Sequence, residues 1–169
     1  MPVICAIHGN CVGGGFQIAL GADIRFAAPD AKLSVRETHW GLIPDMGITS
    51  TLPRLVPIDV AKELTWTARI LSGEEAAALG LVTHLADDPA AAARELALEI
   101  AQRSPDAVRA GKRLYDSSWN APVEEGLVLE TALQLELIGS ENQLAAITAG
   151  MTGDPPQFRD PAPAAVSQA

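Results

Sequence analysis

The chain has 169 residues, which is enough for one domain with a buried core, and 48% of them are hydrophobic while 4% are aromatic. A total of 12 Lys and Arg against 21 Asp and Glu leaves a net charge of −9, which argues against nucleic-acid binding because phosphate contacts need clustered basic side chains. The chain has two cysteines and lacks an uninterrupted apolar segment of spanning length, so we expect neither a disulfide framework nor a membrane partner.

A short apolar segment opens the chain and predicts a buried strand, followed by a glycine-rich turn at Gly13–Gly15 and a helix. The segment, Val3 to Ile7, is short and lacks a basic flank, so we do not expect a signal peptide. We expect a cytoplasmic location instead. Backbone N–H groups at a helix start that side chains do not cover can receive a ligand oxygen. Taken alone, such a turn more often serves close packing, and the P-loop and Gly-x-Ser-x-Gly patterns are absent.

The next part of the chain alternates short strands with short helices, which is typical of an α/β fold. A serine at 72 with a glutamate at 75 forms the pattern of a capping box, and the helix that it opens is expected to end at Gly80. The expected elements are strands at 23–28, 32–35 and 81–85, a loop at 40–47, and helices at 49–54, 59–67 and 72–80.

The remainder is expected to be helical, with prolines at the first helical positions 89 and 105. A helix from Pro122 to Ile138 carries apolar residues on two faces, so we expect it to pack on its own core and on a neighbouring subunit or segment. One face holds Leu127, Val128, Leu135 and Ile138, and the other holds Leu129, Leu133 and Leu137. We therefore divide the chain into a core at 1–100, a helical oligomerisation region at 101–153 and a Pro/Ala-rich tail at 154–169, with little order expected beyond Pro161.

Two carboxylates, Glu37 and Asp45, flank a largely apolar loop. Apolar surroundings raise a carboxyl pKa, so such a pair can serve as proton acceptor and donor. The spacing alone favours a structural interpretation over a catalytic one. In that interpretation, Glu37 caps a helix or forms a pair at the surface, and Asp45 caps a helix that begins at Met46. The three histidines are dispersed without metal-ligand spacing, so no metal site is expected. Both cysteines are expected to be small buried hydrophobes.

Several sequence motifs, taken in order, resemble the enoyl-CoA hydratase/isomerase, or crotonase, family. The resemblance covers nearly the whole chain, and the joint order of the motifs is more specific than any one of them. The matching segments are Pro2–Gly9, Gly13–Gly15, Ala22–Ala27, Glu37–Gly47, Leu52–Leu55, Ala77–Val82 and Phe158–Pro161.

The resemblance implies an α/β, crotonase-like (ClpP/crotonase) fold, in which a partial β-β-α spiral core is followed by C-terminal α-helices that build trimers or dimers of trimers. It implies an acyl-CoA thioester as substrate and an enolate held by two backbone N–H groups. Coenzyme A enters as part of the substrate, so no separate cofactor is expected. The expected setting is fatty acid metabolism by a homotrimer or hexamer.

By motif position, the resemblance assigns one oxyanion N–H to Gly14, the principal base to Glu37 and the second acid/base to Asp45. Related hydratases carry a carboxylate where this chain has Gln17, and glutamine cannot take up a proton from water. Isomerases of the family carry an aspartate at the position of Asp45, so a double-bond shift is as consistent with these residues as hydration. The remaining residues expected at the substrate are Gly13, Gln17, Trp40, Leu42 and Met46.

Family members also carry an N-terminal portion ahead of the strand at Pro2, which supplies the second oxyanion N–H and much of the coenzyme A pocket. The resemblance therefore implies that the chain is N-terminally truncated. The alternative to an acyl-CoA enzyme is a non-catalytic crotonase remnant that only oligomerises. A Clp-type serine peptidase with the same broad fold is disfavoured because the serine motif is missing.

Overall fold

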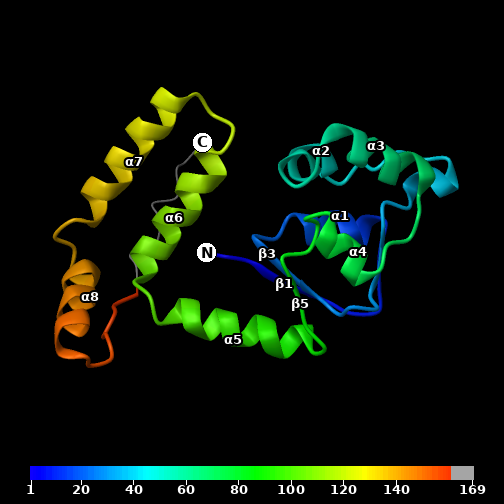
Figure 1. The fold of residues 1–169 in the computed structure, drawn as a ribbon. Helices are drawn as coiled ribbons and strands as arrows, with labels where there is room; N and C mark the ends of the chain where they lie inside the picture. The colour runs from blue at the N-terminus through cyan, green and yellow to red at the C-terminus, as the bar shows by residue number, and fades with distance from the viewer. Residues whose placement is uncertain (161–169) are drawn as a thin grey trace. The chain divides into compact units, whose positions relative to one another are not determined.

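The structure is a computed structural model that describes residues 1–160 (Figure 1). It divides into two compact units. One, called here the α/β unit, is Val3–Ala97, and the other, called the helical unit, runs from Leu98 onward together with Met1–Pro2. Within the described residues, none of the helices is long and apolar enough to cross a membrane.

Two small parallel sheets form the frame of the α/β unit. The first has the order β1 (Ile4–Ile7), β3 (Ile24–Ala27) and β5 (His84–Leu85), and the second pairs β2 (Asn10–Val12) with β4 (Lys32–Ser34). The strands predicted near β1, β3 and β4 are confirmed, and the one predicted at 81–85 is shorter. Strand β2 was not predicted, because three residues between a turn at Gly9 and the glycine-rich turn are too few to show a period.

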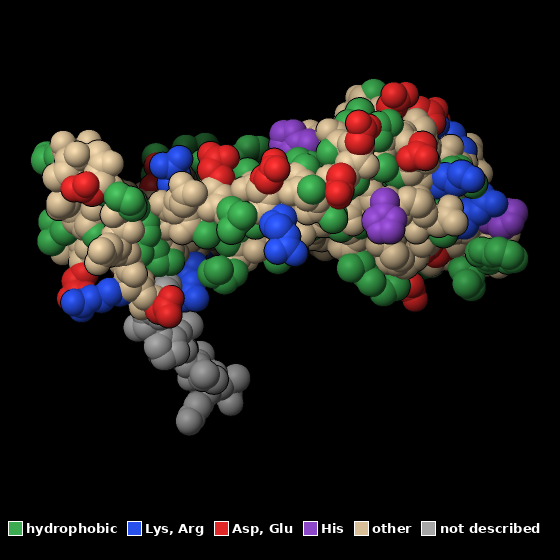
Figure 2. All heavy atoms as spheres, turned by 90° about the horizontal axis from the view of Figure 1, so that it is seen from below, with side chains coloured by type: hydrophobic (Ala, Val, Ile, Leu, Met, Phe, Trp, Pro, Cys, Tyr) green, Lys and Arg blue, Asp and Glu red, His purple; other side chains and the backbone are tan. Residues whose placement is uncertain are grey.

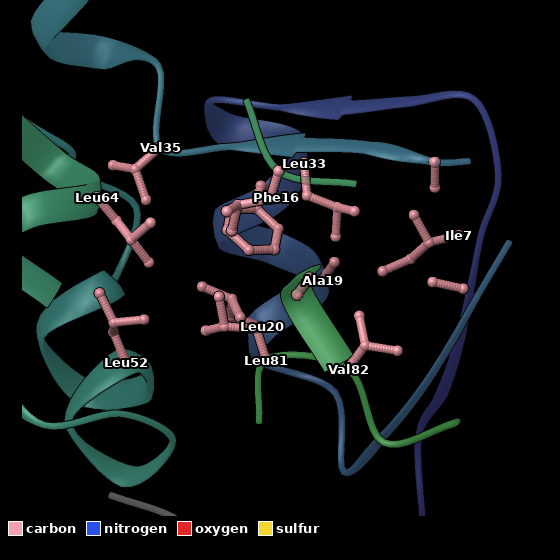
Figure 3. Packing of buried hydrophobic residues seen from close by; sticks show 14 of the residues in the cluster. Ile7, Phe16, Ala19, Leu20, Leu33, Val35, Leu52, Leu64, Leu81 and Val82 are labelled. Carbon is pink, nitrogen blue, oxygen red and sulfur yellow. The ribbon is translucent and has the colours of Figure 1, made fainter. Parts of the chain in front are cut away.

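Helix α1 (Gly14–Leu20) supplies much of the core of this unit. Phe16 is fully buried, and Ala19 and Leu20 are almost so, at 4% and 3% exposed. Figure 3 shows these three side chains surrounded by apolar side chains from the other elements of the unit. The surrounding residues include Leu33, Leu52, Leu64, Leu81 and Val82. Because α1 is buried along this side, its start is held in one place relative to β4.

The segment after β4 follows the predicted loop-and-helix order. A 3-10 helix, η1 (Glu37–Trp40), precedes the loop, and then come α2 (Ile48–Thr51), η2 (Leu52–Arg54) and α3 (Ile58–Thr67). Helix α4 (Gly73–Ala78) is shorter than expected, but its capping box is confirmed: the Glu75 N–H donates to Ser72 Oγ at 3.1 Å, and the Ser72 N–H donates to Glu75 Oε2 at 2.8 Å.

Arg25 is a buried cation in β3, 4% exposed. Its Nε donates to the carbonyl of Leu81 at 2.8 Å and its Nη1 donates to the carbonyl of Ala22 at 2.6 Å. Burial lowers the pKa of the guanidinium, and the nearby Cys5 and Asp23 oppose that shift. The hydrogen bonds satisfy the buried charge and tie β3 to the segment that leads into β5.

The helical unit contains the end of α5 (Pro89–Ala101), then α6 (Pro105–Ser118), α7 (Val123–Leu137) and α8 (Glu141–Thr152). Asn142 on α8 is 4% exposed and donates through Nδ2 to Asp106 Oδ2 at 2.7 Å and to the carbonyl of Arg159 at 3.0 Å. Its Oδ1 accepts from the Arg159 N–H at 2.8 Å. One amide therefore holds α6, α8 and the segment after α8 together.

Helix α7 has the two predicted faces. Leu133 is 4% exposed, and Leu129 and Leu137 on the same face are half-buried. The other face is open in this chain, with Leu127, Val128, Leu135 and Ile138 exposed by 55%, 70%, 69% and 60%. The expected lack of order beyond Pro161 concerns residues outside those that the structure describes.

Candidate functional site

The glycine-rich turn joins β2 to α1 in a conformation that only glycine adopts easily. Gly13 has φ 57° and ψ −129°, and its N–H donates to the carbonyl of Ser34 at 2.9 Å. A Cβ on Gly13 would lie 3.4 Å from Glu37 Oε1, and a Cβ on Gly14 would lie 2.7 Å from Met46 Sδ. The glycines thus let a carboxylate and a thioether lie directly against the start of the helix.

Gln17 and Glu37 form the polar centre of this region. Gln17 is 2% exposed, and its Nε2 donates to Glu37 Oε1 at 2.6 Å. The Gln17 Oε1 accepts from the backbone N–H of Met46 at 2.9 Å. Since one end of the amide binds the carboxylate and the other binds the loop, the orientation of Gln17 is set by both neighbours.

Glu37 retains one unused oxygen. Its Oε2 is buried and has no hydrogen-bond partner among residues 1–160. A buried carboxylate oxygen without a donor is costly, and such atoms need a physical explanation. Glu37 is neither paired with a cation nor at the open surface, so the reading in which it is a surface cap is wrong. The free oxygen is a candidate proton acceptor.

Apolar side chains surround the loop beyond Glu37 but remain open. Trp40, Leu42 and Met46 are exposed by 73%, 64% and 51%, and Ile43 by 77%. Such a group of exposed apolar residues is unusual on a soluble surface and is typical of a place where a ligand or another segment binds. Trp40, Leu42 and Met46, which are predicted to contact the substrate, are thus accessible to a ligand. Ile43, which is also exposed, was not predicted as a site residue.

The structure places five of the predicted site residues next to one another: Gly13, Gly14, Gln17, Glu37 and Met46. Asp45 is exposed and makes no hydrogen bond or ion pair within the described part of the chain. It does not cap a helix at Met46, because α2 begins after Gly47 and has no side-chain cap. What sequence reasoning missed is the role of the Met46 backbone N–H, for which a sequence has no signal.

Charged side chains of both signs occur on the surface of the molecule. On the face of the molecule shown in Figure 2, acidic and basic side chains are interspersed with hydrophobic ones, and no continuous basic surface is seen there. In residues 1–160, no group of three or more His, Cys, Asp or Glu is arranged to hold a metal ion. Cys5 and Cys11, which were expected to be buried hydrophobes, are half-buried and pack against the apolar core.

The chain is similar to proteins of known families along almost its whole length. The family model for enoyl-CoA hydratase/isomerase matches residues 1–160. Mitochondrial methylglutaconyl-CoA hydratase of Mus musculus is 35% identical over 94% of this chain and 52% of its own length. Carnitinyl-CoA dehydratase of Citrobacter koseri is 38% identical over 74% of this chain and 49% of its own length. The chain therefore spans about half the length of the curated relatives it matches.

Solved structures give the same relation. The enoyl-CoA hydratase of Mycobacterium tuberculosis H37Rv has a TM-score of 0.88 at 30% identity, over 94% of this chain and 64% of that one. The enoyl-CoA hydratase of Bacillus anthracis has a TM-score of 0.84 at 34% identity, over 94% of this chain and 62% of that one. These scores confirm the expected α/β fold class of the described residues.

Proposed function

Because the chain belongs to the enoyl-CoA hydratase/isomerase family, we propose that it acts on acyl-CoA thioesters, with Glu37 as the proton acceptor. The observation that carries this proposal is the buried Oε2 of Glu37, which has no partner in residues 1–160 and lies on a carboxylate held against the start of α1. A proton bound to a carbon next to a thioester carbonyl would be removed by this oxygen.

The N–H of Gly14 is the proposed donor to the thioester oxygen. The N–H groups of a first helical turn lack intrahelical partners, so the Gly14 N–H at the start of α1 is left to donate to a ligand oxygen. A donor of this type stabilises the enolate as negative charge develops, by about 3 to 4 kcal/mol. The second donor belongs to a part of the family fold that the chain does not cover.

Gln17 favours isomerisation over hydration. Hydration needs one group to remove a proton from water while another delivers a proton to carbon, and an amide can do neither. Both polar atoms of Gln17 are already engaged, with Glu37 and with the Met46 N–H. In a double-bond shift, Glu37 takes a proton from one carbon to give the thioester enolate, and a proton then returns to the other carbon.

Asp45 is the proposed second acid. It lies one residue before Met46, whose N–H is hydrogen-bonded to Gln17, so the loop carrying Asp45 is attached to the site. Its side chain is exposed and has no partner in the described residues, which leaves it able to reach a bound substrate. The apolar Trp40, Leu42 and Met46 are proposed to contact the acyl chain, with Gly13 lying beside the thioester.

The open face of α7 supports the expected homotrimer or hexamer. Leu127, Val128 and Leu135 together form an exposed apolar strip, which a neighbouring subunit would bury. We place the protein in acyl-CoA metabolism in the cytoplasm and propose no cofactor apart from the coenzyme A of the substrate. Sedimentation of the wild type and of Val128→Asp measures the assembly, which the charge is expected to weaken.

The test is an assay of the purified chain with enoyl-CoA substrates whose double bond is at position 2 or at position 3. Ultraviolet absorbance of the conjugated thioester is expected to rise with the 3-enoyl substrate, and little water addition is expected with the 2-enoyl substrate. Gln17→Glu, which places two carboxylates side by side, is expected to increase hydration. Rapid hydration by the wild type would contradict the proposed role of Gln17.

Calorimetric titration with an acyl-CoA separates the enzyme from the non-catalytic alternative. The assay and titration are done on the chain alone and on the chain joined to the complementary part of a relative. If neither form binds the acyl-CoA and the chain still forms a stable oligomer, the result would favour the alternative of a non-catalytic protein that only oligomerises. Binding that is lost in Gly14→Val, but kept in Gly15→Val, would support a thioester site at the helix start, since a Cβ on Gly15 meets no neighbouring atom.

A further inference from the structure

The side chains on both sides of Glu37 are hydrogen-bonded to the C-terminal end of α3. Arg36 Nη1 donates to the carbonyl of Ala68 at 2.6 Å. Thr38 Oγ1 donates to the carbonyl of Thr65. The last carbonyls of a helix lack partners within it, and a cation near them is favourable because the helix C-terminus carries partial negative charge. The backbone is therefore fixed to α3 immediately before and after the proposed base.

The carbonyl of Ala68 accepts a second hydrogen bond. Ser34 at the end of β4 is 1% exposed, and its Oγ donates to this carbonyl at 3.1 Å. The carbonyl of Ser34 in turn accepts from the Gly13 N–H at 2.9 Å. A carbonyl oxygen has two lone pairs, so it can accept from Ser34 and Arg36 together. One oxygen is thus connected both to the glycine-rich turn and to the segment that carries Glu37.

The backbone of Ala68 has an unusual conformation. Its φ of 50° is the one positive φ of a non-glycine residue in the range 1–160. An alanine in the left-handed region is unfavourable and persists where surrounding contacts enforce it. Ala68 is 3% exposed, and its N–H donates to the carbonyl of Leu64 at 3.2 Å while its own carbonyl accepts from two side chains. The direction of this carbonyl is therefore set by tertiary contacts.

Helix α3 is itself anchored in the core of the α/β unit. Leu64 on α3 is 2% exposed and Val35 is 1% exposed, and both belong to one apolar cluster, in which Figure 3 shows them. Val35 lies between Ser34 and Arg36. This short segment therefore places an apolar side chain in the core and two polar side chains at the end of α3. Because a close-packed core is stiff, α3 is a fixed support for what is bonded to it.

We propose that Arg36 and Thr38 are positioning residues that hold the Glu37 carboxylate against Gln17, with the C-terminal end of α3 as their support. The inference rests on the role of Glu37 proposed above. The Glu37 side chain accepts one hydrogen bond, from Gln17 Nε2 at 2.6 Å, and its Oε2 has no partner in residues 1–160. The position of this carboxylate thus depends on the backbone that carries it. Arg36 and Thr38 act through that backbone and not by touching substrate.

Matched substitutions separate the hydrogen bonds from the packing. Arg36→Met keeps the length of the stem without the donors, and Arg36→Lys keeps a cationic donor. Thr38→Val keeps the shape without the hydroxyl, and Thr38→Ser keeps the hydroxyl. For Arg36→Met and Thr38→Val, kcat with a 3-enoyl-CoA is expected to fall by about tenfold to a hundredfold at nearly unchanged KM, since a small displacement of a catalytic group is enough for such a loss. The Lys and Ser variants are expected to recover most of it. Arg94→Met, at an exposed arginine of α5, is the control and keeps the wild-type kcat.

The side-chain amide of Gln17 reports the position of Glu37 without substrate. Its Nε2 protons are buried and donated to the carboxylate, so nuclear magnetic resonance should show slow exchange with water in the wild type. Exchange is expected to quicken by about tenfold or more in Arg36→Met and in Thr38→Val, because the carboxylate moves away more often. It should stay slow in Thr38→Ser and Arg94→Met. The Phe26 amide in the central strand β3 should change little in every variant, which checks the fold.

The kinetic and exchange measurements separate a failure of this inference from a failure of the proposed function. Wild-type kcat and slow Gln17 exchange in both Arg36→Met and Thr38→Val would overturn the inference, even if urea unfolding shows a loss of global stability, because the hydrogen bonds would then serve folding alone. If circular dichroism shows that one variant does not fold, the other decides. Wild type and Glu37→Gln that are equally active, or both inactive, would contradict the proposed function. The exchange of the Gln17 amide would still show whether Arg36 and Thr38 hold Glu37 in place.

Discussion

The two units of the molecule differ in how they bury apolar side chains. The α/β unit has a continuous core in which Phe16, Leu33 and Leu81 are fully buried. In the helical unit, from Leu98 to Asp160, the buried residues are Leu133 and Asn142. Only the α/β unit encloses a large group of its apolar side chains. A unit with its own core can hold a carboxylate in place, whereas helices with open apolar faces are suited to contact other surfaces.

The largest effect is expected at the carboxylate of the α/β unit. Glu37→Gln keeps the shape of the side chain but removes the proposed proton acceptor, so kcat should fall by about 10² to 10⁴-fold. The matched control is Glu136→Gln on α7, an exposed glutamate of the helical unit, which should leave kcat unchanged. Steady-state kinetics with an enoyl-CoA substrate measures both. Equal activity of wild type and Glu37→Gln would remove the proposed base.

Two leucines test the difference in packing directly. Leu33→Ala opens a cavity in the core and is expected to lower the free energy of unfolding by about 2 to 5 kcal/mol. Leu135→Ala, at a side chain 69% exposed, should change it by about 0.5 kcal/mol or less under conditions where the protein is monomeric. Urea unfolding followed by circular dichroism gives both values. A large loss for Leu135→Ala in the monomer would show that the helical unit has a core of its own.

Asn142 is the polar exception in the helical unit. Asn142→Ala leaves the Arg159 N–H without its partner, so we expect a loss of about 1 to 3 kcal/mol in local stability. Hydrogen exchange should show the loss in α8 and at Arg159, with β1 and β3 unaffected. Gln143→Ala, on the same helix, is the control for helix propensity, although it also removes an acceptor from the Gly139 N–H. Loosening of the α/β unit by Asn142→Ala would contradict the division into two units.

The smallest expected effect is the pH dependence that comes from Cys11. Burial, with a smaller contribution from Cys5, raises the pKa of this thiol from 9.0 to about 11. A group whose pKa is raised in the folded state contributes stability below its unfolded pKa, and that contribution is lost as the pH rises. Stability should therefore decline between pH 9 and pH 11, and by less in Cys11→Ala. Denaturant titrations across this range measure it, and an equal decline in both proteins would rule out Cys11 as its source.

Much of the local structure could be predicted because short-range signals are strong. Ser72 and Glu75 lie at the spacing of a capping box, and the prolines at 89 and 105 mark helix starts. The two faces of α7 follow from leucine spacing alone. Strand β2 could not be predicted, because Asn10–Val12 is too short to show a period. Helix α4 ends before the expected Gly80, at Ala78.

The candidate site was only partly predictable. The order of the motifs assigns roles to Glu37 and Gly14 by residue type, and these roles stay predictions. Motif order carries no information about the contacts that the two residues make. The hydrogen bond from the Met46 N–H to Gln17 joins residues 29 positions apart, and a backbone donor has no residue type to recognise. The same holds for the free oxygen of Glu37, since burial of a single atom depends on every segment packed around it.

The sequence by itself determined the family, the order of the elements and the glycines that let the chain turn at Gly13, because these depend on residue type and local spacing. Tertiary structure alone decided that Gln17 bridges Glu37 and the loop, and that Asn142 joins α6 to the segment after α8. The physical reason is that these features arise where segments distant in sequence pack together. Close packing fixes the positions of side-chain and backbone atoms that the conformational preferences of the local sequence do not determine.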